Sequence, residues 1–272
     1  MTRAILLGAA GAVLSVALLA GGYVAGRPAA AQAEDLPQQV AEATGEQLSR
    51  KDVENIVREY LLANPEVLLE VQKALDAKQK EQQRIAQLSV IKDNKDKLFS
   101  LPTDGVIGNP DGTVTMVEFF DYNCGYCKRA IEDMRAITAA DPNLRFVLKE
   151  FPILGPDSQK ASVVSIAFHK MMPEKYAEFH TQLLGSQGRA GEAQAIKIAV
   201  SLGADEAKLR EAMKDPAIAQ IIDETYELAN KLAITGTPSY VVGTEVIFGA
   251  QGLDVLNQKL AEAKAACATA AC

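Results

Sequence analysis

Residues 118–130 read EFFDYNCGYCKRA and place two cysteines, Cys124 and Cys127, three positions apart directly after an apolar run. The run, TVTMVEFF at 113–120, is β-branched and aromatic, which predicts a buried strand. Residues 124–138 have helical composition and spacing. A strand, a short turn and a helix that starts at the first cysteine therefore decide the fold.

The cysteine spacing predicts a reactive dithiol. On a first helical turn, side chains at i and i+3 have Cβ atoms close enough for a disulfide. The helix N-terminus adds positive potential and free N–H donors, which favour a thiolate on Cys124. Lys128 and Arg129 add positive charge nearby unless their side chains point away, and Gly125 leaves the backbone open to a partner. We interpret Cys124 as the exposed nucleophile and Cys127 as the resolving thiol, with exchange through a mixed disulfide.

Two other interpretations of this pair stay open. A zinc site would need Cys267 and Cys272 as further ligands, and the Ala-rich tail offers no predicted strand or knuckle to hold them. His169 and His180 lie in predicted amphipathic helices, where packing or surface roles are expected. A structural disulfide within so tight a loop would remove little entropy from the unfolded chain. We predict no metal and no cofactor.

The amino terminus has the pattern of an export signal. Arg3 precedes the uncharged residues 4–26, and AQA at 31–33 matches an A-x-A cleavage site. The uncharged run of 23 residues is also long enough for an uncleaved membrane anchor, but twelve of them are Ala or Gly. We expect a signal peptide at 1–33, no membrane span after its cleavage, and a periplasmic destination in which disulfides persist.

The mature chain is expected to be acidic. Cleavage removes Arg3 and Arg27 from the 28 basic residues and leaves 35 acidic residues against 26 basic ones, a formal charge of −9. An acidic protein without basic clusters is poorly suited to nucleic acid, and we expect no nucleic-acid partner.

Residues 34–99 are expected to form a tether and a helical oligomerisation region. Ser49 and Asp52 resemble a capping box at the start of a helix. Leucines recur every seven residues at Leu61, Leu68 and Leu75. So long an amphipathic helix needs something to bury its apolar stripe, either its own domain or a second copy of the chain. We favour self-association, and therefore a homo-oligomer.

A second domain is expected at 106–266, with a tail at 267–272. The turn-rich residues 100–112 form its boundary. Its further predicted elements are a strand at 144–149, a hairpin at 239–248 and a closing helix at 253–265. A block of helices at about 157–233 lies between them. Strands before and after a helical block indicate an α/β domain with a helical insertion.

Three segments together carry a resemblance to a known family. EFFDYNCGYC at 118–127, KEFPILG at 149–155 and TGTPSYVVG at 235–243, in this order, resemble the DsbA family of thioredoxin-fold oxidoreductases over about 106–265. The preceding stalk makes the chain most similar to the ScsC-type branch, whose members are oligomeric disulfide isomerases. The resemblance implies a thioredoxin-like fold with a helical insertion, preceded by an N-terminal helical stalk, and favours a trimer.

The resemblance also implies roles for further residues. Thr237 and Pro238 correspond to a cis-proline loop that faces the dithiol and binds substrate. A proline there lacks a backbone donor and leaves neighbouring groups free to pair with a substrate strand. Glu118 corresponds to a buried acid beneath the site, which would accept or relay the proton of Cys127. A solvated Glu at a strand end is the alternative.

Two features depart from the family pattern. The dipeptide Gly125-Tyr126 has no histidine to help hold a thiolate, which leaves the redox potential open. Gly125 and Tyr126 are expected to contact substrate, although Tyr126 could equally serve packing. Cys267 and Cys272 lie outside the pattern and are expected to form a tail disulfide without a catalytic role, or to tether a partner.

The expected function is that of an exported thiol-disulfide oxidoreductase, most specifically a protein disulfide isomerase acting on misfolded periplasmic proteins. It would need a redox partner, which the sequence does not identify. The alternatives are a DsbA-type dithiol oxidase and a non-catalytic holdase or binding protein.

Overall fold

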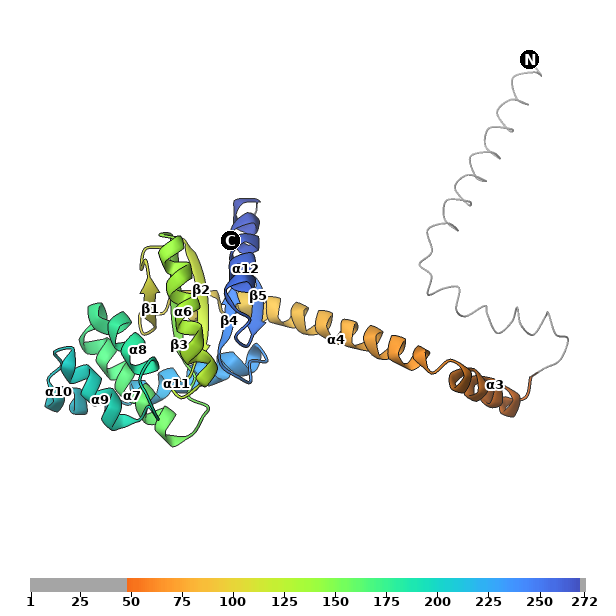
Figure 1. Ribbon diagram of the computed structural model, residues 1–272, viewed down its shortest axis with the longest axis horizontal. Coiled ribbons are helices and arrows are strands. Elements are labelled where there is room, and N and C mark those ends of the chain that lie inside the picture. The colour runs from red at the N-terminus through yellow and green to blue at the C-terminus, as the bar shows by residue number, and fades with distance from the viewer. Residues whose placement is uncertain (1–47, 270–272) are drawn as a thin grey trace, which may run out of the picture. The chain divides into compact units, whose positions relative to one another are not determined.

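The structure is a computed structural model that describes residues 48–269, with side chains as far as Ala266. The expected signal peptide and Cys272 lie outside the described residues, as does the side chain of Cys267. Among the residues that are described, no helix is both long and apolar enough to cross a bilayer. The chain divides between Leu75 and Asp76 into two compact units, which are considered separately below (Figure 1).

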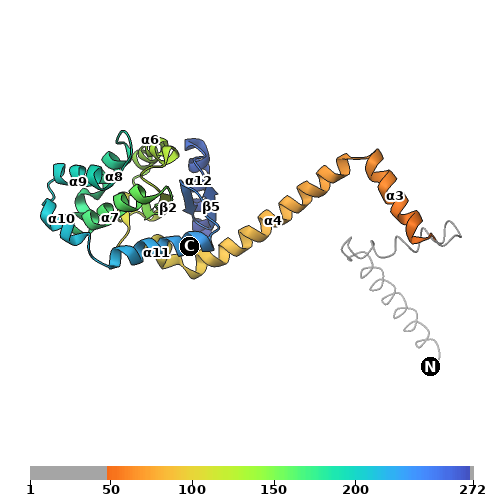
Figure 2. The same cartoon turned by 90° about the horizontal axis from the view of Figure 1, so that it is seen from below.

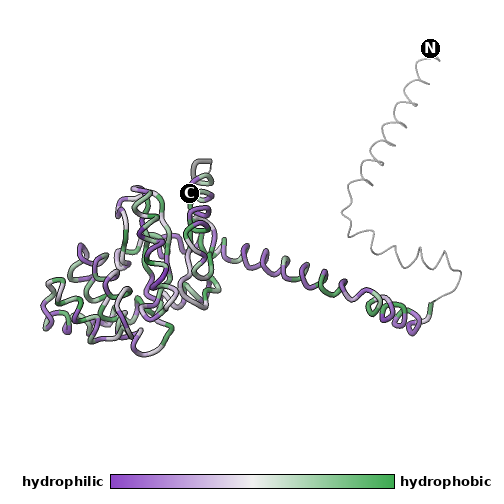
Figure 3. The backbone as a smooth tube through the Cα atoms, in the orientation of Figure 1, coloured by the Kyte–Doolittle hydropathy of each residue, from purple (hydrophilic) through white to green (hydrophobic). Residues whose placement is uncertain are grey.

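The first unit contains α3 (Arg50–Ala63) and the first turns of α4 (Glu66–Asp93). The predicted capping box is confirmed, because Asp52 N donates to Ser49 Oγ at 3.3 Å and Ser49 N donates to the Asp52 carboxylate at 3.0 Å. Helix α3 has no buried residue, and Figure 3 shows hydrophobic and hydrophilic positions interspersed along it. The exposed apolar set of this unit is defined as the large apolar residues that α3 and the first turns of α4 expose: Val53, Ile56, Val57, Tyr60, Leu62, Leu68, Leu69, Val71 and Leu75.

The second unit begins inside α4 and includes α5 (Lys95–Phe99). Ile91 and Leu98 are buried in an apolar cluster with residues of the sheet, and Gln87 Nε2 donates to the Leu232 carbonyl at 2.7 Å. The sequence boundary was expected after residue 99. The structure differs because the apolar side chains of α4 and α5 pack on the domain from Gln87 onward.

The core of the second unit is a five-stranded sheet in the order β1-β3-β2-β4-β5. The strands are β1 (Gly105–Gly108), β2 (Val114–Phe120), β3 (Leu144–Glu150), β4 (Ser239–Val242) and β5 (Glu245–Phe248). β2 and β3 pair in parallel, and the other pairs are antiparallel. The four strands predicted from the sequence are confirmed. β1 was not predicted, because it lies in residues 100–112, which were expected to contain only turns.

Alternation along β2 assigns its side chains to the two faces of the sheet. Met116 and Phe120 pack in the larger core with α6 (Gly125–Ala140), whereas Val117 and Phe119 pack in the cluster that contains Ile91. Because successive side chains of a strand point to opposite faces, Glu118 lies on the α6 face. The expected buried acid and the helix that carries the cysteines therefore share one face.

The helices between β3 and β4 form the predicted insertion. They are α7 (Pro156–Met171), the 3₁₀-helix η2 (Pro173–Lys175), α8 (Tyr176–Leu184), α9 (Glu192–Ser201), α10 (Glu206–Ala212) and α11 (Ala217–Lys231). Figures 1 and 2 both show α7 to α10 gathered beyond the β1 edge of the sheet. The closing helix α12 (Leu253–Thr269) packs beside α6 and β4. The predicted α/β domain with a helical insertion is confirmed.

Candidate active site

The two cysteines lie where β2 passes into α6. Asp121 to Cys124 form a turn in which Cys124 N donates to the Asp121 carbonyl at 3.0 Å. Cys124 is the N-cap residue of α6, with extended backbone angles, and its sulfur accepts from Cys127 N at 3.4 Å. A sulfur in the N-cap position thus receives one of the N–H groups that the first helical turn leaves unpaired.

Hydrogen bonding and burial make the two thiols unequal, and both are free. A hydrogen bond from the Cys127 side chain lowers the pKa of Cys124 to about 5, and smaller contributions from the Thr237 side chain and the backbone of the first helical turn help to outweigh desolvation. Burial raises the pKa of Cys127 far above its ordinary value, and the hydrogen bond to Cys124 and the charge of Glu118 act in the same direction. At neutral pH, the geometry favours a thiolate at Cys124 and a thiol at Cys127.

The loop before β4 lies against the first cysteine. The Thr237–Pro238 peptide bond is cis, and the Thr237 carbonyl lies 3.1 Å from Cys124 Sγ, from which it accepts a hydrogen bond when the sulfur is protonated. The antiparallel pairing of β4 with β2 carries this loop to the end of the sheet at which α6 begins. The structure thus brings Cys124, Cys127, Thr237 and Pro238 together from parts of the chain more than 100 residues apart.

Glu118 is buried on the α6 face of the sheet, and its exposed fraction is 1%. Its Oε2 has no hydrogen-bond partner, and Tyr240 lies opposite it on β4. Burial, and after it the charge of Cys124, raises the pKa of Glu118 to about 8. A buried carboxyl with this pKa gains and loses its proton near neutral pH, and its charge acts in turn on the pKa of Cys127.

Gly125 and Tyr126 form the exposed side of the dithiol. Tyr126 is 60% exposed, and the guanidinium carbon of Arg129 lies 4.4 Å from the centre of its ring. Lys128 is turned away from the cysteines, because its Nζ donates to the carbonyls of Ser186 at 2.8 Å and Gly188 at 3.2 Å. The lowered pKa of Cys124 therefore comes from hydrogen bonds and not from these two cations.

The two histidines pack against aromatic rings. His180 is fully buried beside Phe120, with ring centres 4.7 Å apart, and burial lowers its pKa to about 3. The ring of His169 lies 4.7 Å from that of Tyr176. Within the described part of the chain, no group of three or more His, Cys, Asp or Glu side chains is placed to hold a metal ion.

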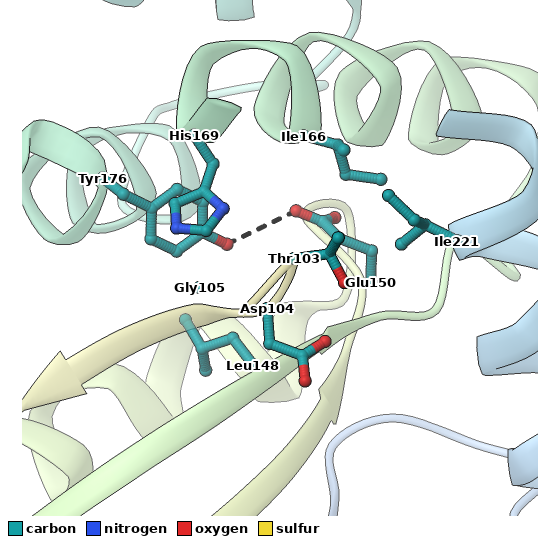
Figure 4. Close-up of a pocket in the computed structure, with 9 residues that line it drawn as sticks. All are labelled: Thr103, Asp104, Gly105, Leu148, Glu150, Ile166, His169, Tyr176 and Ile221. Carbon is teal, nitrogen blue, oxygen red and sulfur yellow. Dashed lines mark hydrogen bonds between the residues drawn. The ribbon is translucent and has the colours of Figure 1, made fainter. Parts of the chain in front are cut away.

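A small cavity lies elsewhere in the domain. Its volume is about 10 Å³, which is room for about one water molecule. Figure 4 shows Glu150 in this cavity with its carboxylate towards Tyr176, whose hydroxyl donates to it at 3.4 Å. Neither cysteine lines it, so the cavity is separate from the dithiol.

Three residues of the turn and its surroundings were not singled out from the sequence. The Asp121 carboxylate accepts hydrogen bonds from Asn123 N, Ser158 Oγ and Leu154 N. Asn123 bonds Ser158 and Ala190 through its side chain. The Asp-x-Asn order before a helix is a turn signal that the sequence offers, but the partners of Asp121 and Asn123 in the insertion and before it lie 33 to 67 residues away.

The comparisons with known proteins agree with this geometry. The DSBA-like thioredoxin domain profile matches residues 115–261, and the profile of the copper resistance protein ScsC N-terminal domain matches residues 50–82. A thioredoxin-like oxidoreductase from Silicibacter pomeroyi DSS-3 is 40% identical, with a TM-score of 0.60, over 63% of this chain and 98% of that one. Proteus mirabilis ScsC in a transitional conformation is 29% identical, with a TM-score of 0.60, over 79% and 96%.

Curated relatives match over somewhat more than half of this chain. Disulfide bond formation protein D of Bacillus subtilis is 25% identical over 174 residues, which cover 59% of this chain and 77% of that protein. The chain spans about a quarter of the length of the first curated relatives it matches, two Na(+)/H(+) antiporters NhaA of Salinispora.

The fold, the profile match and the free Cys-x-x-Cys pair at a helix N-terminus define a DsbA-like thioredoxin domain. The chain belongs to the DsbA-like thioredoxin domain family, and its residues 50–82 are similar to the ScsC N-terminal domain.

Proposed function

We propose that this protein is an exported protein disulfide isomerase whose nucleophile is Cys124 and whose resolving thiol is Cys127. The observation that carries the thiol-disulfide chemistry of this proposal is the inequality of the two thiols. Cys124 sits at the helix N-terminus with a pKa lowered to about 5, whereas Cys127 is fully buried and protonated at neutral pH. A thiolate is the form that attacks a disulfide.

The exchange begins when the Cys124 thiolate attacks one sulfur of a substrate disulfide. The substrate S–S bond breaks, a mixed disulfide forms, and the second substrate sulfur leaves as a thiolate. In isomerisation, another substrate thiolate attacks the mixed disulfide, so that a new substrate disulfide forms and Cys124 returns as a thiolate. No net oxidation or reduction occurs, and no cofactor is required.

The resolving step breaks a mixed disulfide that no substrate thiolate has attacked. Cys127 loses its proton and attacks Cys124, which releases the reduced substrate and leaves a Cys124–Cys127 disulfide. Glu118 is proposed to accept that proton, because its carboxyl is buried on the same face and its pKa is raised to about 8. An unidentified redox partner must then supply two electrons to regenerate the dithiol.

Substrate is proposed to lie between Gly125-Tyr126 and the Thr237-Pro238 loop. Tyr126 offers an exposed ring stacked with Arg129. Pro238 has no N–H, and Thr237 already places its carbonyl beside Cys124 Sγ. An extended segment of an unfolded protein would pair with this loop by strand addition.

Isomerase activity is favoured over oxidase activity by the first unit. Its exposed apolar set lies within residues 50–82, which match the ScsC N-terminal domain. We propose that these side chains are buried in a homo-oligomer, with a trimer favoured by the ScsC resemblance. Several dithiols around one substrate raise the effective concentration of thiolate at its disulfides. The export signal expected at residues 1–33 and the proposed disulfide chemistry together favour the periplasm.

A DsbA-type oxidase is the second candidate, and the lowered pKa of Cys124 favours it. A stabilised thiolate stabilises the reduced dithiol and makes its disulfide a stronger oxidant. A non-catalytic holdase would need neither cysteine, and the Cys124→Ala variant tests this alternative.

Reactivation of scrambled ribonuclease tests the proposal, with oxidation of reduced ribonuclease measured in parallel. An isomerase reactivates the scrambled enzyme, and Cys124→Ala abolishes this activity. A protein that only oxidises the reduced enzyme would be the DsbA-type oxidase. Undiminished protection of unfolded ribonuclease by Cys124→Ala, without reactivation by the wild type, would identify a holdase.

A further inference from the structure

The residue before the nucleophile is held by the helical insertion. Asn123 is half-buried, and its side-chain amide makes three hydrogen bonds. Nδ2 donates to Ser158 Oγ at 2.9 Å and to the Ala190 carbonyl at 2.8 Å. Oδ1 accepts from Ala190 N at 2.8 Å. The amide thus pairs with both backbone groups of Ala190, as a neighbouring strand would.

The same turn is fastened a second time through Asp121. Its Oδ1 accepts from Asn123 N at 2.7 Å and from Ser158 Oγ at 2.8 Å, and its Oδ2 accepts from Leu154 N at 2.9 Å. Asp121 and Ser158 are buried, so these bonds are shielded from water. Ser158 belongs to α7 and serves as the shared partner of Asp121 and Asn123.

These bonds fix the backbone from which the Cys124 side chain starts. Cys124 follows Asn123 directly, and Cys124 N closes the turn by donating to the Asp121 carbonyl. Its extended N-cap conformation directs the sulfur at Cys127 N and at the Thr237 carbonyl. The hydrogen bond from Cys127 N to this sulfur, at 3.4 Å, depends on its angle, so a rotation of this turn would weaken it.

We propose that Asn123 is a positioning residue that clamps the Cys124 turn to Ser158 and Ala190, so that the helical insertion sets the geometry of the nucleophilic sulfur. The inference rests on the proposed role of Cys124. It assigns the insertion a function at the dithiol beyond shaping the domain. Asn123 does not touch the reacting sulfur of a substrate, and it acts through the backbone of its neighbour.

The surrounding charges do not offer another route for this effect. The groups that act on the ionisation of Cys124 are Cys127 on α6, Thr237 on the facing loop, and the backbone of Tyr126. The charge of Glu118 couples to Cys124 from β2. Asn123 is uncharged, so replacing it by Ala leaves every one of these groups in place and changes only how the turn is held.

Three single variants of the full chain test the clamp. Asn123→Ala removes all three side-chain bonds to the insertion. Ser158→Ala, a change in α7, removes one hydrogen bond of Asn123 and one of Asp121. It keeps the two hydrogen bonds between Asn123 and Ala190. Asn143→Ala is the matched control, because Asn143 is an exposed asparagine in the turn before β3. The ultraviolet absorbance of the Cys124 thiolate is followed against pH in each reduced protein, together with its thermal unfolding midpoint.

Asn123→Ala should raise the midpoint of the thiolate titration by about one pH unit, which is about tenfold less thiolate well below the midpoint. Ser158→Ala should raise it by less, and Asn143→Ala should leave it unchanged. The double variant Asn123→Ala with Ser158→Ala should shift the midpoint by less than the sum of the two single shifts, because both changes break the same hydrogen-bonded cluster.

A folded Asn123→Ala protein with the wild-type titration would overturn the inference, even if its thermal midpoint falls, because a purely structural role lowers stability alone. If Asn123→Ala does not fold, Ser158→Ala decides by the same reading, and an unshifted midpoint overturns the clamp. A wild-type protein in which no thiol titrates in the acid range would instead defeat the proposed role of Cys124. The two failures are therefore distinguishable.

Discussion

Replacement of Cys127 tests the origin of the low pKa of Cys124. The largest contribution to that pKa is the hydrogen bond from the Cys127 side chain. A donor stabilises the thiolate, so its presence lowers the pKa and its loss raises it. Cys127→Ala removes the donor, whereas Cys127→Ser keeps an O–H at the same position. Neither variant can form the internal disulfide, which leaves Cys124 permanently available to an alkylating reagent.

The expected magnitude follows from the pKa of about 5. At this pKa Cys124 is about half ionised at pH 5 and about 99% ionised at pH 7, whereas a pKa of 9.0 would leave it about 1% ionised at pH 7. Loss of one donor is expected to raise the pKa by about one unit, so the alanine variant should alkylate about fivefold more slowly than the serine variant at pH 5. At pH 7 the two rates should be nearly equal.

The assay is the rate of iodoacetamide alkylation across the acid and neutral range, read by mass spectrometry on the peptide that contains Cys124. Peptide resolution excludes signal from Cys267 and Cys272. Identical pH profiles in the two variants would refute the assignment of the low pKa to the Cys127 donor. A wild-type midpoint near 9.0 would refute the thiolate itself.

Three further changes test other parts of the structure. The pKa of Glu118 is raised from 4.5 to about 8, so its stabilising contribution is complete below pH 4.5 and is lost as the pH rises through 8. The free energy of unfolding of Glu118→Gln, measured by urea titration, should therefore equal that of the wild type near pH 4. Above pH 8 it should exceed the wild-type value by a few kcal/mol, and a difference that does not change with pH would contradict this. Ile91→Ala should lower the free energy of unfolding by about 2–4 kcal/mol, and the exposed Ile85→Ala by less than about 1, whereas equal losses would exclude the end of α4 from the core. Val57→Glu combined with Leu68→Glu should reduce the mass measured by light scattering to that of one chain, and an unchanged mass would remove these side chains from the oligomer contact.

The sequence predicted the local parts of the fold because their signals are local. The capping box at Ser49 needs only residues three apart, and β2 is a continuous β-branched and aromatic run. β1 was missed because its four residues, GVIG, are too short for a period and stand among turn residues. They form a strand because β3 offers an edge to pair with. The domain boundary was placed too late because the burial of Ile91 and Leu98 depends on a sheet that follows them in the chain.

In the candidate active site, too, the local features were predicted from the sequence and the long-range contacts were not. The helix N-terminus at Cys124 follows from the strand-to-helix change, and Thr237-Pro238 follows from the resemblance alone. The directions of Lys128 and Arg129 could not be read from the sequence, because Lys128 bonds carbonyls 58 and 60 residues away. Asn123 falls in the short turn expected before the helix, and its partner Ala190 lies 67 residues further on. Side-chain partners at such separations exist only once the insertion has packed.

The chemistry at the dithiol does not by itself separate an isomerase from an oxidase. A thiolate stabilised at Cys124 favours the reduced dithiol, which an isomerase needs in order to attack a substrate disulfide. The same stabilisation makes the Cys124–Cys127 disulfide a stronger oxidant of reduced substrates. Which state persists depends on the partner that exchanges electrons with Cys124 and Cys127. The difference must therefore lie in what delivers the site to substrate. An oxidase works through one dithiol at a time, whereas an isomerase gains from several held around one misfolded chain. The exposed apolar set of the first unit is the part of the described chain that could assemble such a group, and so the oligomeric state decides between the two functions.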